Sequence, residues 1–290
     1  MGDSRAHLAM LFPGQGSQTS DMRDQVERHR PDLLELAQRE VSEDLFERAD
    51  DGTRWAQPAI FCAALAGYEV LKDRYEPDLM AGHSLGEISA LVAAGALDAD
   101  DGLRLVAARG RLMQEAAEET GDGSMLAVRA RDRAPVERVA AEAEVSIAND
   151  NAPDQLVLSG SLAALDEAER LLGEQKVRAK RLPVAGAFHS PLMEPAVEPF
   201  RRIVEQTEVA EAQVPVLSCV TAEPFHDVRE QLVQAITHPV RWTDVMGALR
   251  ARGAERFVET GPGRVLTNLV RKSLDGVEAE APLDLEATRV

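Results

Sequence analysis

The sequence has few of the features that mark disulfide-stabilised or nucleic-acid-binding proteins. It contains only two cysteines, Cys62 and Cys219, which lie far apart in the chain and predict neither a disulfide framework nor a zinc site. Lys and Arg number 32 against 50 Asp and Glu, which gives a formal net charge of −18. Such an acidic chain lacks the positive field that binds phosphate backbones, so we expect no nucleic-acid partner.

Long apolar runs are also missing. No stretch approaches the roughly 18 apolar residues of a transmembrane helix, so we expect no membrane span. The apolar run at residues 8–12 ends at Pro13 and Gly14, and it is too short for the h-region of a secretory signal peptide. Together these absences predict a cytoplasmic protein.

The chain has the length and composition of a globular protein. Its 290 residues are 44% hydrophobic and 28% charged, which suits one large domain or a domain with an insert. Short apolar runs at residues 8–12 and 77–82 each end in a glycine-containing loop, which predicts buried strands of an α/β domain. From about 124 to 184 the expected order is β-α-β-β-α-β, which indicates a ferredoxin-like insert. We expect the acidic tail from Asp275 to be weakly ordered.

The most informative short motif is GHSLG at residues 82–86. A nucleophilic serine on a strained strand-to-helix turn needs small residues two positions before and after it, and Gly82 and Gly86 flank Ser84 in this way. The N–H of Leu85 would then face a developing oxyanion. The alternative is a glycine-rich turn whose serine caps a helix.

A nucleophilic serine requires a base, and the sequence has six histidines. His83 adjoins Ser84 too closely for a suitable geometry, and His7 and His29 lie in polar stretches. His189 lies in a loop after an expected strand, where catalytic groups are common. We therefore predict that His189 accepts the Ser84 proton, with a solvated loop histidine as the alternative.

Five motifs occur in the order known from one enzyme family: LFPGQGSQ (11–18), GHSLGE (82–87), ARGRLMQ (108–114), GAFHSPLMEPA (186–196) and ETGPGRVLTNL (259–269). With them the chain resembles the malonyl-CoA:acyl carrier protein transacylases over nearly its whole length. The same fold class includes the acyltransferase domains of polyketide and fatty acid synthases. The resemblance implies an α/β-hydrolase-like core with a parallel sheet, residues 1–123 and 188–290. It also implies an inserted ferredoxin-like α+β subdomain, residues 124–187.

The resemblance implies a role for each matching residue. Ser84 would be the nucleophile, His189 the general base, and the N–H groups of Gln15 and Leu85 the oxyanion donors. Arg109 would bind the free carboxylate of a malonyl group, which a guanidinium can hold through two parallel hydrogen bonds. From its neighbours alone, Arg109 reads instead as one of several surface arginines on a charged helix. The remaining implied positions are a substrate pocket at His83, Phe188, Gln57, Asn149 and Asn151, and a main-chain carbonyl near Arg241 that orients His189.

The implied reaction is a ping-pong transfer of a malonyl group from malonyl-CoA to the phosphopantetheine thiol of an acyl carrier protein. The acyl group would pass through a malonyl ester of Ser84. In the polyketide acyltransferase domains, a loop of the type HAFH accompanies a preference for malonyl. The corresponding residues here are GAFH (186–189), so Phe188 matches the malonyl type and Gly186 departs from the first letter. Leu85 after the serine also matches the malonyl type. We expect no metal or redox cofactor, because no His, Cys and Asp cluster has ligand spacing. By analogy with related discrete enzymes we expect a monomer.

Docking of the carrier protein poses a difficulty of charge. Acyl carrier proteins are usually acidic, so an acidic enzyme would need a local basic patch to bind one. Arg271 and Lys272 form one candidate, and a solvated charged face without function is the alternative. The preferred candidate is the segment KVRAKR, with Lys176, Arg178, Lys180 and Arg181.

Other functions stay open at this point. A serine hydrolase, such as an esterase or an acyl-carrier editing hydrolase, would share Ser84 and His189 but would admit water to the acyl-enzyme. A discrete acyltransferase could move another acyl group, or could serve a polyketide synthase in trans. A non-catalytic member of the fold would need neither residue, so the intact motifs disfavour it.

Overall fold

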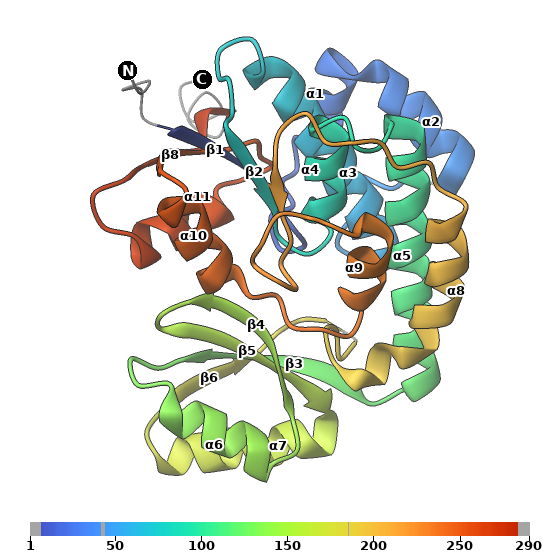
Figure 1. The fold of residues 1–290 in the computed structure, drawn as a ribbon. Helices are drawn as coiled ribbons and strands as arrows, with labels where there is room; N and C mark the ends of the chain where they lie inside the picture. Colours follow the sequence, from blue (N-terminus) through green and yellow to red (C-terminus); the bar gives the residue numbers. More distant parts are fainter. Residues whose placement is uncertain (1–6, 42–43, 185, 284–290) are drawn as a thin grey trace.

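The structure, a computed structural model, describes residues 7–41, 44–184 and 186–283. A parallel five-stranded sheet with the order β7-β2-β1-β8-β9 lies at the centre of the larger part (Figure 1). Its strands are β1 (His7–Phe12), β2 (Leu79–Gly82), β7 (Val216–Leu217), β8 (Ala254–Glu259) and β9 (Glu278–Glu280).

Both faces of this sheet are covered, which explains why its strands are continuous apolar runs. In β1 the side chains of Met10 and Phe12 join one buried cluster, whereas Ala9 and Leu11 join another on the opposite face. Helices α10 (Trp242–Ala251) and α11 (Val265–Ser273) pack on the second face. The first face is covered by α1 (Met22–His29), α2 (Pro31–Val41), α3 (Thr53–Leu71), α4 (Gly86–Ala93), α5 (Ala99–Thr120), the 3-10 turn η1 (Pro191–Met193), α8 (Glu194–Glu205) and α9 (Val228–Gln234).

A second, antiparallel sheet forms the smaller part, below the core in Figure 1. Its strand order is β4-β5-β3-β6, the order of a ferredoxin-like fold. One face of this sheet packs on the two helices of the insert through side chains such as Leu126 and Leu158. On the other face, Met125 and Val157 join the buried cluster of the larger part. The elements are β3 (Gly123–Arg129), α6 (Ala134–Glu142), β4 (Ser146–Ala152), β5 (Gln155–Ser161), α7 (Leu162–Glu174) and β6 (Arg178–Arg181).

The predicted fold class, an α/β core with a parallel sheet and an inserted ferredoxin-like subdomain, is confirmed. The expectation of a weakly ordered tail from Asp275 is wrong for part of that segment. Residues 278–280 form β9, which pairs in parallel with β8 and extends the central sheet. The rest of the tail, 284–290, lies outside the described residues. No described helix is long and apolar enough to cross a membrane.

Candidate active site

Ser84 lies on a sharp turn between β2 and α4. Its backbone is left-handed, with φ of 55°. A Cβ at Gly82 would lie 1.9 Å from the backbone of Gly86, and a Cβ at Gly86 would lie 2.2 Å from the carbonyl oxygen of Phe12. Only glycine fits at both positions, so the two glycines of the motif permit the turn that presents Ser84.

The structure brings His189 into contact with Ser84. The Ser84 Oγ lies 2.9 Å from His189 Nε2, and His189 Nδ1 lies 3.1 Å from the carbonyl oxygen of His238. Because a carbonyl only accepts, Nδ1 carries the hydrogen and Nε2 is left to accept the Ser84 hydroxyl. The predicted orienting carbonyl near Arg241 is wrong. The backbone N–H of Arg241 donates to the Cys219 carbonyl, and the chain presents the His238 carbonyl three residues earlier.

His189 is held neutral by its surroundings. The side chain is buried, and burial lowers its pKa to about 3, with further lowering by the charges of Arg109 and His83. Backbone hydrogen bonds to His238 and Ala235 oppose this shift without reversing it. At neutral pH the imidazole is therefore unprotonated, which is the state that a general base requires.

Arg109 is a buried cation in the middle of α5, not a surface arginine. It is 3% exposed, and its guanidinium donates to Ser84 Oγ at 3.1 Å and to Gln57 Oε1 at 2.9 Å. Burial lowers its pKa to about 10, so it stays charged at neutral pH. Gln57 in turn donates to Thr53, whose hydroxyl donates to Gln15 Oε1 at 2.8 Å. This chain of hydrogen bonds fixes the guanidinium beside the nucleophile.

Two backbone donors face the same space. Gln15 follows β1, and Leu85 precedes α4, and both line a cleft of about 650 Å³ together with Ser84. Within the described residues, neither the N–H of Gln15 nor that of Leu85 donates to a backbone or side-chain acceptor. Two free N–H groups beside the serine can stabilise an oxyanion.

The other predicted pocket residues also line this cleft. It includes His83, Gln57, Asn149, Asn151 and Phe188. His83 Nε2 lies 2.8 Å from Asn151 Oδ1, and its ring contacts Trp242 with centroids 5.3 Å apart. His83 therefore makes a bond with an amide and is no rival to His189 as the base.

Sequence reasoning missed one buried acid at the site. Glu87, three residues after the nucleophile, is 1% exposed, and its Oε1 accepts the N–H of Cys219 at 2.6 Å. Burial raises its pKa to about 7, although the Cys219 N–H, Arg109 and Ser218 oppose the shift. A single acid in the apolar helix GEISALVA was the available signal, since lone acids are seldom buried.

The predicted basic segment does not form one surface. Arg181 faces α7, where it pairs with Asp166 and Glu169. Arg178 and Lys180 point to the opposite face of the sheet, because side chains alternate along a strand. Lys176 lies in the turn before β6 with φ of 58°.

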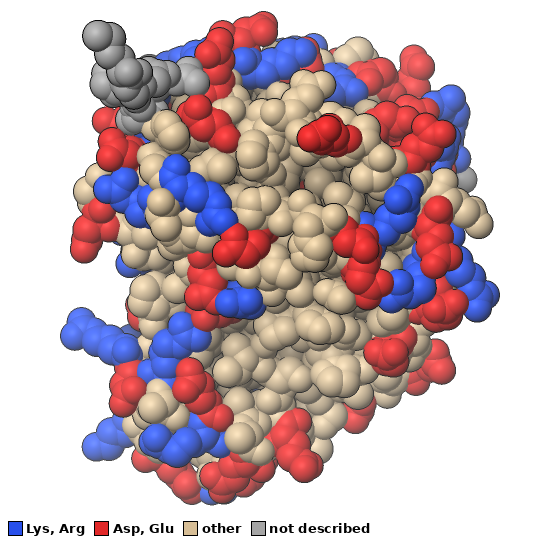
Figure 2. All heavy atoms as spheres, in the orientation of Figure 1, with Lys and Arg blue, Asp and Glu red and all other residues tan. Residues whose placement is uncertain are grey.

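Arg178 and Lys180 belong to a larger basic group that extends from the cleft side of the insert to α11 of the core. Arg129 pairs with Arg178 in register, and also with Gln155, which accepts from Lys272 at 3.2 Å. We call Arg129, Arg178, Lys180 and Lys272 the cleft-side basic patch. All four are exposed, and none has an ion-pair partner within the described part of the chain. Figure 2 shows Lys and Arg side chains at the left of the lower lobe, beside Asp and Glu.

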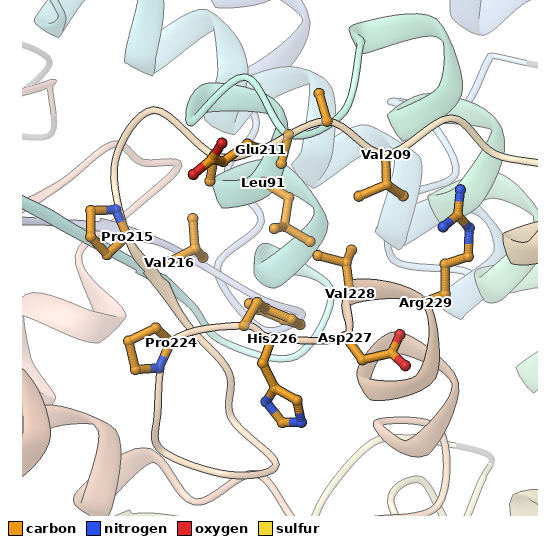
Figure 3. Close-up of a pocket in the computed structure, with 14 residues that line it drawn as sticks. Leu91, Val209, Glu211, Pro215, Val216, Pro224, His226, Asp227, Val228 and Arg229 are labelled. Atoms are coloured by element: carbon orange, nitrogen blue, oxygen red, sulfur yellow. The ribbon is translucent and has the colours of Figure 1, made fainter.

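A second hollow, of about 480 Å³, lies between α4 and the start of α9 (Figure 3). Leu91, Val216 and Val228 give it an apolar wall. Of its polar residues, Asp227 caps α9 and Arg229 donates to a backbone carbonyl, so both have structural roles. It contains no pair of nucleophile and base. Elsewhere too, the described residues hold no cluster of three or more His, Cys, Asp or Glu that could bind a metal.

Comparison with known proteins agrees with this geometry. The acyl transferase domain family matches residues 10–285. The malonyl CoA-acyl carrier protein transacylase of Bacillus subtilis is 37% identical over 285 residues, covering 91% of this chain and 90% of the relative. The polyketide biosynthesis protein ThaF of Burkholderia thailandensis is 40% identical over 92% of this chain, but the chain spans only 24% of ThaF.

A solved structure supplies the same comparison in three dimensions. It is that of a type II polyketide acyl carrier protein in complex with its malonyl-transacylase, and it aligns with a TM-score of 0.88 and 34% identity. The match covers 94% of this chain and 95% of the solved one. With a family match over most of its length, the chain belongs to the acyl transferase domain family.

Proposed function

We propose that this protein transfers a malonyl group from malonyl-CoA to the phosphopantetheine thiol of an acyl carrier protein. One observation carries the proposal. Ser84 Oγ is in contact with a neutral histidine on one side and a buried arginine on the other, within a single cleft. The histidine can activate the serine for transfer of any acyl group, whereas the arginine can bind an acyl group that bears a carboxylate.

The first half-reaction forms an ester. Ser84 Oγ attacks the thioester carbon while its proton passes to His189 Nε2. The N–H groups of Gln15 and Leu85 bind the tetrahedral oxyanion, a contribution of roughly 3–4 kcal/mol per donor in comparable sites. The C–S bond then breaks, and the imidazolium returns the proton to the CoA sulfur.

The second half-reaction reverses the roles. The phosphopantetheine thiol gives its proton to His189 and attacks the malonyl ester, and Ser84 leaves with that proton. The enzyme returns to its starting state, so no metal, redox group or other co-reactant takes part. The absence of a cofactor requirement remains a prediction.

Arg109 supplies the preference for malonyl. A charge-assisted hydrogen bond contributes about 1.5–3 kcal/mol, and a malonyl carboxylate can take two of them. Phe188, which is 9% exposed at the cleft wall, limits the space for a branch at the α-carbon. A few kcal/mol of such discrimination separates malonyl from acetyl and methylmalonyl donors.

The cleft-side basic patch is the surface we propose for the carrier protein. Leu182, which lines the cleft, follows β6 directly, two residues after Lys180, and its N–H donates to the Met125 carbonyl. An acidic partner held there would present its phosphopantetheine arm to the cleft. The solved complex of a carrier protein with its malonyl-transacylase supports a partner of this kind. The monomeric state and the cytoplasmic location remain predictions.

Intact-mass measurement without any carrier protein tests the proposal. Wild type mixed with malonyl-CoA should gain one malonyl group, and Ser84→Ala should gain none. Acetyl-CoA and methylmalonyl-CoA should acylate more slowly. Rapid release of CoA without a stable adduct would instead favour a serine hydrolase. If the protein forms no adduct and releases no CoA, malonyl-CoA is not its acyl donor.

A further inference from the structure

Arg109 is an electrostatically unusual cation. Its two direct side-chain partners, Gln57 and Ser84, are both neutral. Among the described residues, no carboxylate forms an ion pair with the guanidinium; Glu87 acts on it only at longer range. A buried charge without a direct counter-charge is costly, so the site is built for an anion that arrives with the substrate.

That cation also restrains the catalytic pair. The Ser84 Oγ accepts a hydrogen bond from Arg109 while it lies 2.9 Å from His189 Nε2. A lone pair engaged by a guanidinium is a weaker nucleophile. In addition, the positive charge of Arg109 disfavours a second positive charge on His189, which must form when the serine proton is transferred.

We propose that the carboxylate of the incoming acyl group activates the Ser84–His189 pair by neutralising Arg109. This rests on the proposed function, and it extends the role of Arg109 from holding the substrate to triggering the reaction. The carboxylate draws the guanidinium away from Ser84 Oγ and cancels its charge. The serine lone pair becomes free, and His189 becomes a stronger base at the moment when a correct substrate is bound.

The bonds made and broken are those of ordinary acylation. The Ser84 Oγ–H bond breaks as the proton moves to His189 Nε2, the Oγ–C bond forms, and the C–S bond breaks with the proton passing to sulfur. The carboxylate takes part in none of these bonds and leaves unchanged. Its effect is on the barrier alone, so it should appear in the acylation rate at saturating donor and not only in KM.

Other groups act on the pair whichever donor is bound. His83, on the nucleophile turn, lowers the pKa of His189 electrostatically, while backbone hydrogen bonds to His238 and Ala235 raise it. Glu87 on α4 and Cys219 after β7 act electrostatically on Arg109, and neither lines the cleft. Because all of these are present with any donor, a difference between malonyl and acetyl donors reports on the substrate carboxylate.

A small free carboxylate can test the idea, because acetyl-CoA with formate separates the acyl group from the charge. The rate of acyl-enzyme formation would be followed by quenched-flow mass spectrometry at saturating acetyl-CoA, with formate or with sodium chloride at equal ionic strength. Formate should accelerate acetylation by about tenfold, equivalent to about 1.4 kcal/mol of barrier. A pH series should give a higher inflection for acylation with malonyl-CoA than with acetyl-CoA, since neutralising Arg109 raises the basicity of His189.

Arg109→Gln is the matched control, because it removes the charge but keeps a polar side chain. In this variant formate should have no effect on acetylation. Equal acceleration in Arg109→Gln, or none in wild type, would overturn the proposal. Identical inflections for the two donors would overturn it as well. In each of these cases malonyl-enzyme would still form, so the proposed function would stand; if neither donor acylates Ser84, the proposed function itself fails.

Discussion

Ser84 and His189 meet at 2.9 Å, and both hold left-handed backbones there, with φ of 55° and 57°. Each such residue costs on the order of 1 kcal/mol, and it persists only where its surroundings impose it. For Ser84 the surroundings are the glycines of the turn. For His189 they include Ser190, whose buried hydroxyl donates to the Ala187 carbonyl at 2.6 Å. The contact is therefore formed before any substrate arrives.

The burial of His189 predicts a particular dependence of stability on pH. Its pKa is about 3 in the folded protein and about 6.5 when unfolded, so the unfolded chain binds a proton first as the pH falls. The unfolding free energy of wild type should drop relative to His189→Gln as pH falls from about 6.5 toward 3, by up to about 1.4 kcal/mol per pH unit. Urea unfolding of both proteins over this range measures it. A constant difference between the two would contradict the burial of a neutral imidazole.

The burial of Glu87 predicts the opposite dependence of the unfolding free energy on pH. Its pKa is about 7 when folded against 4.5 when exposed, so the folded protein keeps the proton longer as pH rises. The unfolding free energy of wild type relative to Glu87→Gln should therefore decline as pH increases from about 4.5 to 7. Glu87→Ala should also cost about 1–3 kcal/mol, because the Cys219 N–H loses its buried acceptor. If Gln and Ala variants unfold alike at every pH, Glu87 is not the acceptor described.

Much of the fold could be predicted because local pattern and tertiary environment agree. The run LAMLF is apolar at every position because both faces of β1 are buried, and GHSLG carries glycines where a Cβ would clash. The β-α-β-β-α-β order of the insert could be recognised for the same reason. Each element has the periodicity that its burial requires.

Two of the errors concern features set by the tertiary path of the chain, and one concerns the alternation of side chains along a strand. The carbonyl beside His189 belongs to His238 and not Arg241, because the path of the chain between α9 and α10 decides which carbonyl points inward. Arg181 does not share a surface with Arg178, because residues three apart on a strand face opposite sides of the sheet. Glu87 gives only the signal of a single acid in an apolar helix, because its hydrogen-bond partner Cys219 is 132 residues away in sequence.

Gly186 should determine the position of the Phe188 ring. A Cβ at Gly186 would lie 2.6 and 2.9 Å from atoms of that ring and 3.0 Å from the Ala117 Cβ. Gly186→Ala must therefore displace the Phe188 ring at the cleft wall, and kcat/KM for malonyl-CoA should fall by about tenfold because the acyl group is then misplaced. Steady-state kinetics of the variant checks this.

Phe188→Ser provides the partner for a double-mutant cycle. Alone it should raise kcat/KM for methylmalonyl-CoA relative to malonyl-CoA by about tenfold, since it opens space for one methyl group. With the ring gone, adding Gly186→Ala should have little further effect. A full additional loss in the double variant would show that Gly186 acts through other contacts, such as Ala117.

The cleft-side basic patch should matter for the carrier protein and not for the chemistry at Ser84. Reversing Arg178 and Lys180 to Glu removes two exposed cations that have no described ion-pair partner and places like charge before an acidic partner. KM for the carrier protein should rise by about tenfold, and the effect should shrink as salt is added, because exposed charges are screened. Acylation by a short malonyl thioester without phosphates should be unchanged, which separates docking from catalysis.

Arg202 offers the control for that experiment. It lies on α8, is exposed and pairs only with the neighbouring Glu198 among the described residues, so Arg202→Glu changes net charge without touching the patch. If long-range charge alone governed association, Arg202→Glu would raise the carrier KM in proportion to its charge change. If the patch is the docking site, Arg202→Glu should behave as wild type. Equal effects of patch and control variants, or no effect of the patch variant, would place the carrier elsewhere on the surface.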